Sequence, residues 1–216
     1  MKVYYRVSDK LSSNPNPLGK NKQEIIVTCM SSFLRTGVDR NEITIIHDGG
    51  DVPDIDDWRI KSEKVIYTKK TGLVESLNCA LDEVCKLPNE ENVFLVEDDY
   101  LWIPDCLPLI ERALDTLPLI SPYDHPGHYM EDRFKNQPKK MVLIENQTYR
   151  QAPSNTHTFA CKAWVVKQNV ELIKSFGMRD HDMFTALGID LYVPVPSFAT
   201  HLVVGLLAPN RQWKIK

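Results

Sequence analysis

The chain has 216 residues, of which 43% are hydrophobic and 25% are charged, and these proportions are ordinary for a globular protein with a sizeable core. The formal net charge is −3 and the basic residues are scattered, which argues against nucleic acid as a partner. No apolar run approaches the length of a membrane span, and the N-terminus lacks a signal-peptide pattern.

The five cysteines form an odd-numbered set without a C-x-x-C pair, and most lie among apolar neighbours. Small, apolar cysteines of this kind suit a reducing compartment. We therefore expect a cytoplasmic protein.

Strands and helices alternate along the first half of the chain. Runs rich in β-branched and aromatic residues predict strands at 2–7, 42–46, 65–67 and 93–96. Apolar residues at helical spacing predict helices at 25–34 and 73–84, and Pro104 opens a third that continues to Leu117. Segments 8–21 and 53–59 are polar or acidic and irregular, which is typical of loops.

The second half is less regular. Short strands are expected at 119–121 and 141–144, a strand turn followed by a helix within 163–176, and a short helix at 180–187. The apolar segment 191–195 is interrupted by a proline. No repeat or linker divides the chain, so we expect one α/β domain, with a mostly parallel central sheet flanked by helices.

The strand at 93–96 runs directly into three carboxylates, Glu97, Asp98 and Asp99. Its four apolar residues lack polar alternation, which indicates a buried, parallel strand. In open α/β sheets the carboxyl ends of the strands are where ligands bind. Because side chains alternate along a strand, Glu97 and Asp99 share one side and Asp98 takes the other.

Adjacent carboxylates repel one another and are costly to desolvate unless a positive charge shares the site. A divalent cation is the simplest such charge. The alternative is a solvated acidic turn that closes the strand and binds nothing.

Four pieces in a fixed order resemble the nucleotide-sugar half of GT-A glycosyltransferases, and glycosyltransferase family 2 most of all. They are the acidic turn HDGGD at 47–51, the segment TGLVESLNCAL at 71–81, the segment FLVEDD at 94–99, and a helix start with Pro104 and Leu107. The family shows the same order: an acidic turn, a Gly, an Asn, an apolar strand into a D-x-D type motif, and a Pro-x-x-Leu helix start. The match is looser beyond residue 110.

The resemblance implies a single GT-A domain over residues 1–216. Residues 1–110 would bind the nucleotide sugar, and 111–216 the acceptor. The implied activity is metal-dependent transfer of a sugar from a nucleotide donor, UDP-linked, to a hydroxyl acceptor such as a glycan. Inversion is preferred because no residue offers itself as a nucleophile on the opposite face of the donor.

A departing nucleoside diphosphate carries high negative charge, which Mn²⁺ or Mg²⁺ neutralises as a Lewis acid. By resemblance Asp99 is the direct metal ligand, and Asp98 contacts the ribose or the metal. Glu97 is a further candidate ligand, although its extra methylene moves the carboxylate outward from where the family has Asp. A late histidine, His201, would join the metal or the diphosphate; alternatively it is a satisfied core residue.

The resemblance also implies a set of nucleotide contacts: Arg6, Ser8, Asp9, Asp48, Lys70, Gly72, Asn78 and Asp98. The family's Pro-x-Tyr-Asn motif is absent, and Arg6 to Asp9 stand in its place. Asp48 would receive the base; alternatively it is a turn aspartate before two glycines. Lys70 and its neighbour Lys69 would reach phosphate or form a solvated basic turn.

Removing a proton from the acceptor hydroxyl needs a base, which the family places at the start of a late helix. Asp180 and Asp182 both lie in such a segment and, two residues apart on a helix, point in different directions. Alignment with the family favours Asp180, whereas helix capping by Asp180 would leave Asp182 for chemistry. Both remain candidates, beside the alternative that they only complement the helix dipole.

Trp102 and His157 are candidates for binding the acceptor. An indole stacks well on a sugar, although core packing explains a tryptophan equally well. His157 lies in a segment that resembles the acceptor-lining region of the family. The pair His125 and His128 lacks the partners of a zinc site, and a loop or acceptor role suits it better.

Two other functions are compatible with the sequence. A nucleotidyltransferase also uses carboxylate-bound Mg²⁺ on an α/β sheet, but segment 8–19 has a single glycine where such enzymes carry a glycine-rich loop. A sugar-nucleotide-binding module without turnover is the other alternative.

Overall fold

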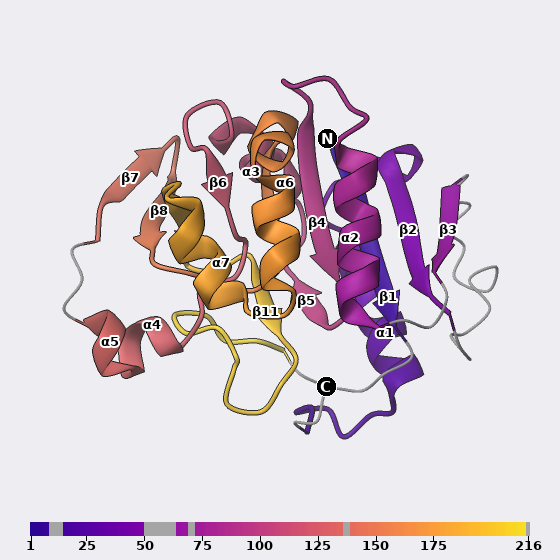
Figure 1. Ribbon diagram of the computed structural model, residues 1–216. Helices are drawn as coiled ribbons and strands as arrows, with labels where there is room; N and C mark the ends of the chain where they lie inside the picture. The colour runs from indigo at the N-terminus through magenta and orange to yellow at the C-terminus, as the bar shows by residue number, and fades with distance from the viewer. Residues whose placement is uncertain (9–14, 50–63, 69–71, 136–138, 215–216) are drawn as a thin grey trace.

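The computed structural model describes residues 1–8, 15–49, 64–68, 72–135 and 139–214 (Figure 1). A nine-stranded sheet has the strand order β3-β2-β1-β4-β9-β6-β10-β8-β7. Its strands are β1 (Lys2–Ser8), β2 (Ile43–Asp48), β3 (Lys64–Thr68), β4 (Asn92–Glu97), β6 (Leu119–Ile120), β7 (Met141–Ile144), β8 (Gln147–Ala152), β9 (Phe159–Lys162) and β10 (Leu191–Val195). The strands β5 (Tyr100–Trp102) and β11 (Ala199–His201) form a separate two-stranded sheet.

The helices are α1 (Lys22–Phe33), α2 (Leu73–Val84), α3 (Leu107–Ala113), α4 (Gly127–Met130), α5 (Asp132–Lys135), α6 (Ala163–Phe176) and α7 (Asp180–Leu187), with a 3₁₀ turn at Arg40–Glu42. The N-terminus of α1 illustrates why these segments fold locally. Asn21 and Glu24 form a capping box, in which each side chain accepts from the other residue's backbone N–H.

The sheet is mostly parallel, as the sequence predicts. In the described part of the chain all its strands run in one direction except β8 and β9. Parallel neighbours need a crossover, and α1 and α2 supply the crossovers between β1 and β2 and between β3 and β4.

Helices cover both faces of the sheet (Figure 1). Ile26 and Phe33 of α1 pack with Ile110 of α3 in one buried cluster, whereas Leu77 of α2 packs with Phe184 of α7 in the other. Strands between two helical layers are buried on both sides, which explains the unbroken apolar run of β4 and the burial of β1 from Val3 to Ser8.

The topology gathers distant residues at one edge. Parallel pairing places Arg6 of β1 beside Glu97 of β4. The antiparallel strand β9 pairs Phe159 with Leu95, so the residues before β9 lie at that same edge. Pairing of β5 with β11 sets His201 opposite Tyr100.

Most predicted elements are confirmed, with some differences. The helix predicted from Pro104 begins at Leu107, and Pro108 occupies its first turn. Strands β5, β8, β9 and β11 were not expected. The strand turn expected within 163–176 was wrong, because α6 occupies that whole range and β9 precedes it. Across the described residues, the helices fall short of the length and apolar character that crossing a membrane requires.

Trp102 lies in the core rather than at an acceptor site. Its side chain is 3% exposed and packs edge-on against Phe33 and Phe94, with ring centroids 5.2 and 5.6 Å away. Trp102 belongs to a three-residue edge strand whose inward side faces these rings, and this position explains the burial.

Trp102→Ala should therefore destabilise the fold by about 3–5 kcal/mol, because it opens a cavity among aromatic rings. Urea unfolding of the parent and the variant measures this difference. A loss below about 1 kcal/mol would contradict the packing role.

Candidate functional site

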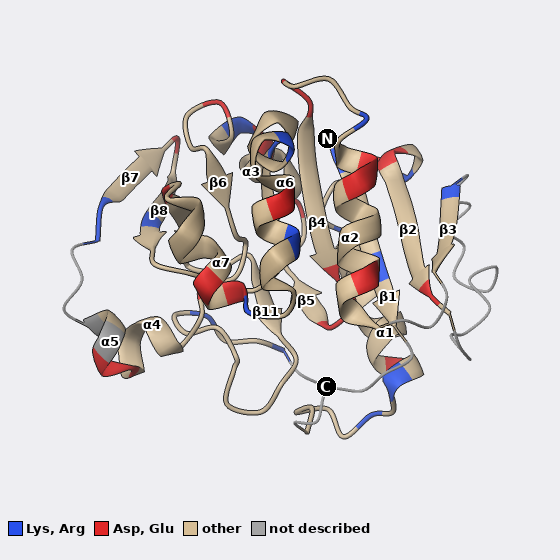
Figure 2. Ribbon diagram, in the orientation of Figure 1, with Lys and Arg blue, Asp and Glu red and all other residues tan. Residues whose placement is uncertain are grey.

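A cavity of about 410 Å³ opens at the carboxyl edge of the sheet, a volume that suits a small-molecule ligand. Figure 2 shows acidic residues at the ends of β2 and β4 and in α7 on this edge. The lining residues are Arg6, Val7, Ser8, Lys22, Leu73, Ser76, Glu97, Asp98, Asp99, Thr156, His157, Met178, Asp180 and His201.

Each carboxylate of the acidic triplet has a different partner. Glu97 forms an ion pair with buried Arg6, at 2.9 Å from Nη2 to Oε1. The Thr158 hydroxyl donates to the other oxygen of Glu97 at 3.0 Å. The structure therefore holds Glu97 between β1 and the residue that precedes β9, and its expected role as a metal ligand stays a prediction.

Asp98 is buried between the first strand and the first helix. The Ser8 backbone N–H donates to Asp98 Oδ2 at 2.8 Å, and the Lys22 ammonium donates to Oδ1 at 2.6 Å. Burial raises the pKa of Asp98 in spite of the opposing charge of Lys22. Burial acts to lower the pKa of Lys22, but the charges of Asp98 and Asp99 raise it overall, so the ammonium stays charged.

Asp99 pairs with His201, at 2.9 Å from Oδ2 to Nε2. Burial opposes the charge of Asp99, yet the charge and hydrogen bond of His201 lower its pKa overall. Burial also opposes the charge of His201, yet Asp99 raises its pKa overall. The imidazole stacks on Tyr100, with ring centroids 4.9 Å apart and planes 9° from parallel. Both side chains are therefore held in fixed orientation at the cavity.

The pair Asp99 and His201 fits a divalent cation that takes its remaining ligands from a bound substrate. A carboxylate and an imidazole are both ligands for Mn²⁺, and they converge at one wall of the cavity. Among the described residues no three His, Cys, Asp or Glu side chains gather into a ready metal centre. Cations at nucleotide sites commonly take one or two protein ligands and complete their shell with phosphate oxygens and water.

The structure separates the two candidate bases. Asp180 lines the cavity, and its Oδ1 accepts the backbone N–H of His181 at 2.8 Å. Burial is the main cause that raises the pKa of Asp180 to about 6. Asp182 is half exposed, lies outside the cavity and faces Arg179 at 3.8 Å. The cavity therefore contains Asp180 and not Asp182.

His157 lines the cavity from the segment before β9. Its side chain is 2% exposed, and Nε2 has no hydrogen-bond partner among the residues that the structure describes. Burial, with a smaller contribution from the charge of Arg6, lowers the pKa of His157 to about 3. The ring is therefore neutral and offers one free nitrogen for hydrogen bonding.

Several residues predicted to bind the nucleotide lie outside the cavity. Asp48 is buried and accepts from the Thr68 hydroxyl at 2.9 Å and from the Gly72 N–H at 3.4 Å, so it joins β2 to β3 and to the start of α2. Asn78 lies inside α2, away from the cavity. Asp9 and Lys70 fall outside the described residues. Base binding by Asp48 stays a prediction.

Sequence reasoning missed Lys22, Thr156 and Thr158. The capping box at Asn21 marks a helix start after the first strand, and it was a signal that could have placed Lys22 at the carboxyl edge. Thr158 had no comparable signal, because it reaches Glu97 only through the antiparallel pairing of β9 with β4. The same pairing brings Thr156 to the edge of the sheet, where its hydroxyl bonds to that of Tyr100 at 2.7 Å.

Comparisons with known proteins bear on the fold. No family model and no curated protein matches the chain. Among solved structures, S. aureus TarS 1–349 matches at 15% identity and a TM-score of 0.52, over 89% of this chain and 58% of that one. GalNAc-T7, solved with UDP, GalNAc and Mn²⁺, matches at 11% identity and a TM-score of 0.61, over 98% of this chain and 45% of that one. Both are GT-A glycosyltransferases.

The chain has the GT-A fold. TarS 1–349 was also solved in complex with UDP, and that structure matches at 15% identity and a TM-score of 0.51, over 89% of this chain and 57% of that one. This GT-A chain thus spans about half the length of the proteins it matches.

The raised pKa of Asp180 has a consequence for stability. Between the ordinary pKa of an aspartate and about 6, the folded chain holds a proton that the unfolded chain releases. The free energy of unfolding therefore decreases as pH rises through this window. Asp180→Asn should remove the part of this decrease that Asp180 causes, because asparagine does not titrate. Urea unfolding at about pH 4 and about pH 7 measures it. Asp182→Asn is the matched control and should keep the parent's pH dependence; an Asp180→Asn variant that also keeps it would contradict the assignment.

Proposed function

We propose that this chain transfers a sugar from a UDP-linked donor to a hydroxyl acceptor with the help of Mn²⁺ or Mg²⁺. The observation that carries the proposal is the convergence, in one cavity, of the acidic triplet with its cationic partners and of Asp180. The donor would lie against residues of 1–110, and the acceptor would approach along residues of 111–216. The likeness to structures solved with UDP supports this choice of nucleotide.

The diphosphate end of the cavity contains Lys22, Asp99 and His201. Asp99 and His201 would hold the cation, which neutralises the charge that develops on the departing UDP. Lys22 is charged and lies at the same wall, so its ammonium can donate to a phosphate oxygen while it continues to neutralise Asp98.

Asp180 is the proposed general base. As the acceptor oxygen bonds to the anomeric carbon, the bond from that carbon to the UDP oxygen breaks, and the acceptor proton passes to Asp180. A carboxyl pKa of about 6 suits this transfer better than an ordinary one, because the carboxylate is a stronger base and is still ionised at neutral pH.

The engagement of the other carboxylates supports the proposal of an inverting transfer. Glu97 is paired with Arg6, Asp98 with Lys22 and Asp99 with His201. Among the described residues lining the cavity, Asp180 is the carboxylate without a cationic partner, and it serves as the base. This supports a single displacement at the anomeric carbon without a protein nucleophile.

The direct test is UDP release from UDP-glucose, UDP-galactose and their N-acetylated counterparts, with Mn²⁺ and with EDTA. We expect metal-dependent release that falls at least about 100-fold in Asp99→Asn and in Asp180→Asn, since these remove a charge-stabilising group and a base respectively. UDP affinity should weaken in Asp99→Asn and stay near that of the parent in Asp180→Asn.

Asp182→Asn is the control and should keep full turnover. UDP binding without release from any of these donors would indicate the binding module instead. Full activity in Asp99→Asn would remove the metal assignment.

Lys22→Gln should raise the KM for the donor by about 10–100-fold, because it removes a charged donor from the diphosphate wall. The measurement is the initial rate against donor concentration, with urea unfolding to account for the partner that Asp98 loses. Lys20→Gln removes a nearby charge that does not line the cavity and should leave KM unchanged. Equal KM values for both variants would contradict the role of Lys22.

A further inference from the structure

A second, smaller cavity of about 100 Å³ lies on the other side of Asp180 from the first. It shares Thr156 and Asp180 with the larger cavity, so the two meet at the proposed base. Its lining residues are His125, His128, Glu131, Phe134, Ser154, Asn155, Thr156, Asp180 and His181.

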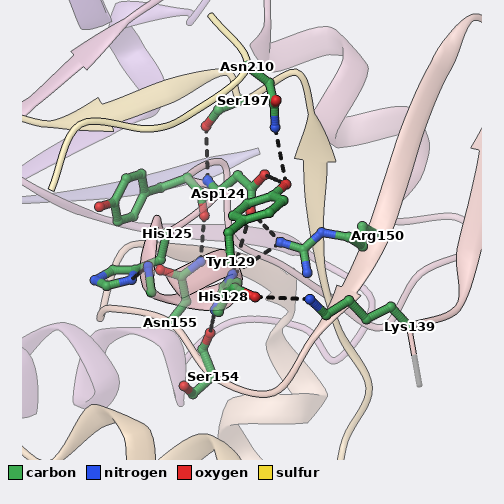
Figure 3. A network of polar contacts seen from close by, with 12 residues as sticks. Asp124, His125, His128, Tyr129, Lys139, Arg150, Ser154, Asn155, Ser197 and Asn210 are labelled. Atoms are coloured by element: carbon green, nitrogen blue, oxygen red, sulfur yellow. Dashed lines mark hydrogen bonds and ion pairs between the residues drawn. The ribbon is translucent and has the colours of Figure 1, made fainter. Parts of the chain in front are cut away.

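A buried polar network fixes one wall of this small cavity (Figure 3). His128 is 1% exposed, and its Nε2 bonds to the Ser154 carbonyl at 2.8 Å. Arg150 contacts His128 Nδ1 at 3.2 Å and donates to buried Asp124, which also accepts the Tyr129 hydroxyl at 2.5 Å. Because each polar group is held by the next, this wall is preformed.

Another part of the lining, formed by His125 and Glu131, depends on a glycine. A Cβ at Gly127 would lie 2.3 Å from Glu131 Oε1 and 2.8 Å from His125 Nδ1, so the missing side chain allows both groups to approach the helix backbone. His125 Nδ1 accepts the Gly127 N–H at 2.9 Å. Burial, followed by the charge of His128, lowers the pKa of His125 to about 4, which leaves the ring neutral. A neutral imidazole beside a carboxylate is well suited to hydroxyl groups.

A third, open cavity of about 420 Å³ continues beyond the rings of Phe134 and His181. These two rings meet edge-on, 5.5 Å between centroids, and they line both the small and the open cavity. Phe184 and Thr185 of α7 belong to the open cavity. The small and open cavities therefore adjoin at Phe134 and His181, and aromatic and polar side chains line both.

Charge distinguishes the two sides of Asp180. The first cavity contains the cations Arg6 and Lys22, which suit a diphosphate. Among the described side chains, the small and open cavities present the carboxylates of Glu131 and Asp190, and neither lysine nor arginine. An anionic ligand would meet like charges on these linings, and the guanidinium of Arg150 behind His128 is already paired with Asp124.

We propose that the small and open cavities bind a neutral saccharide acceptor. Its terminal unit occupies the small cavity and directs a hydroxyl toward Asp180, and its next unit lies in the open cavity against Phe134 and Phe184. This inference rests on the proposed function, since Asp180 must receive the proton of that hydroxyl while the sugar leaves UDP.

The test measures UDP release first without an acceptor and then with four kinds of acceptor. Neutral methyl glycosides and neutral disaccharides of glucose, galactose and N-acetylglucosamine are compared with anionic glucuronic acid and glucose 6-phosphate, and with a serine-containing peptide. We expect neutral saccharides to raise the rate above hydrolysis by water, and disaccharides to do so with the lower KM.

Hydrolysis without an acceptor separates the two proposals. If UDP is released without an acceptor but no neutral saccharide raises that rate, this inference alone is overturned. It is also overturned alone if the anions or the peptide raise the rate more than the neutral saccharides do. The absence of UDP release under every condition overturns the proposed function, and this inference with it.

Two variants locate the acceptor. His125→Trp fills the small cavity and should abolish stimulation by every saccharide, with folding verified by its thermal transition and its affinity for UDP. Thr185→Trp is a change at an exposed position that narrows the open cavity, and it should raise the KM for disaccharides by about tenfold or more without changing that for methyl glycosides.

Ala186→Trp is the matched control, because residue 186 is also exposed on α7 but lines neither cavity. It should behave as the parent does. If Thr185→Trp leaves the KM for disaccharides unchanged, or if His125→Trp still responds to saccharides, the acceptor does not bind here.

Discussion

The constraint on which the site depends is the placement of three consecutive carboxylates at the end of a buried strand. Such a cluster is unfavourable unless each charge is compensated, and the fold supplies a separate partner for each from a different element. Glu97 receives Arg6 from β1, Asp98 receives Lys22 from α1, and Asp99 receives His201 from β11. These three contacts also hold β1, α1 and β11 against the end of β4. The ion pairs that compensate the carboxylates therefore also assemble this part of the cavity.

Asp180 marks the boundary between two chemically different regions. On one side the cavity has cations, a carboxylate–imidazole pair and the ends of parallel strands, all of which favour a nucleoside diphosphate. On the other side the described walls are aromatic, hydroxylic and acidic. Asp180, whose pKa is raised by burial, lies at this boundary and is well placed to take the proton of an acceptor hydroxyl that meets the donor there.

Local patterns were sufficient for most of the fold and for part of the site. Helix α2 was predicted because its hydrophobic periodicity is strong, and β4 because its apolar run is unbroken. The GT-A resemblance rested on the order of these elements. The partners of the site residues were not predictable: the ion pair of Glu97 with Arg6 depends on the parallel register of β1 and β4, which the sequence does not specify. Trp102 could have been a sugar platform or a core residue, and only its packing against Phe33 decides between them. Strand β9, which runs against its neighbours, has no signal in the chain for where it inserts.

The most direct measurement of the central claim is a crystal structure with UDP and Mn²⁺, in which anomalous scattering identifies the ion. The account predicts one manganese peak bound to both Asp99 and His201, with the diphosphate beside Lys22 and Glu97 still paired with Arg6. A manganese ion coordinated elsewhere, or UDP bound outside this cavity, would contradict it.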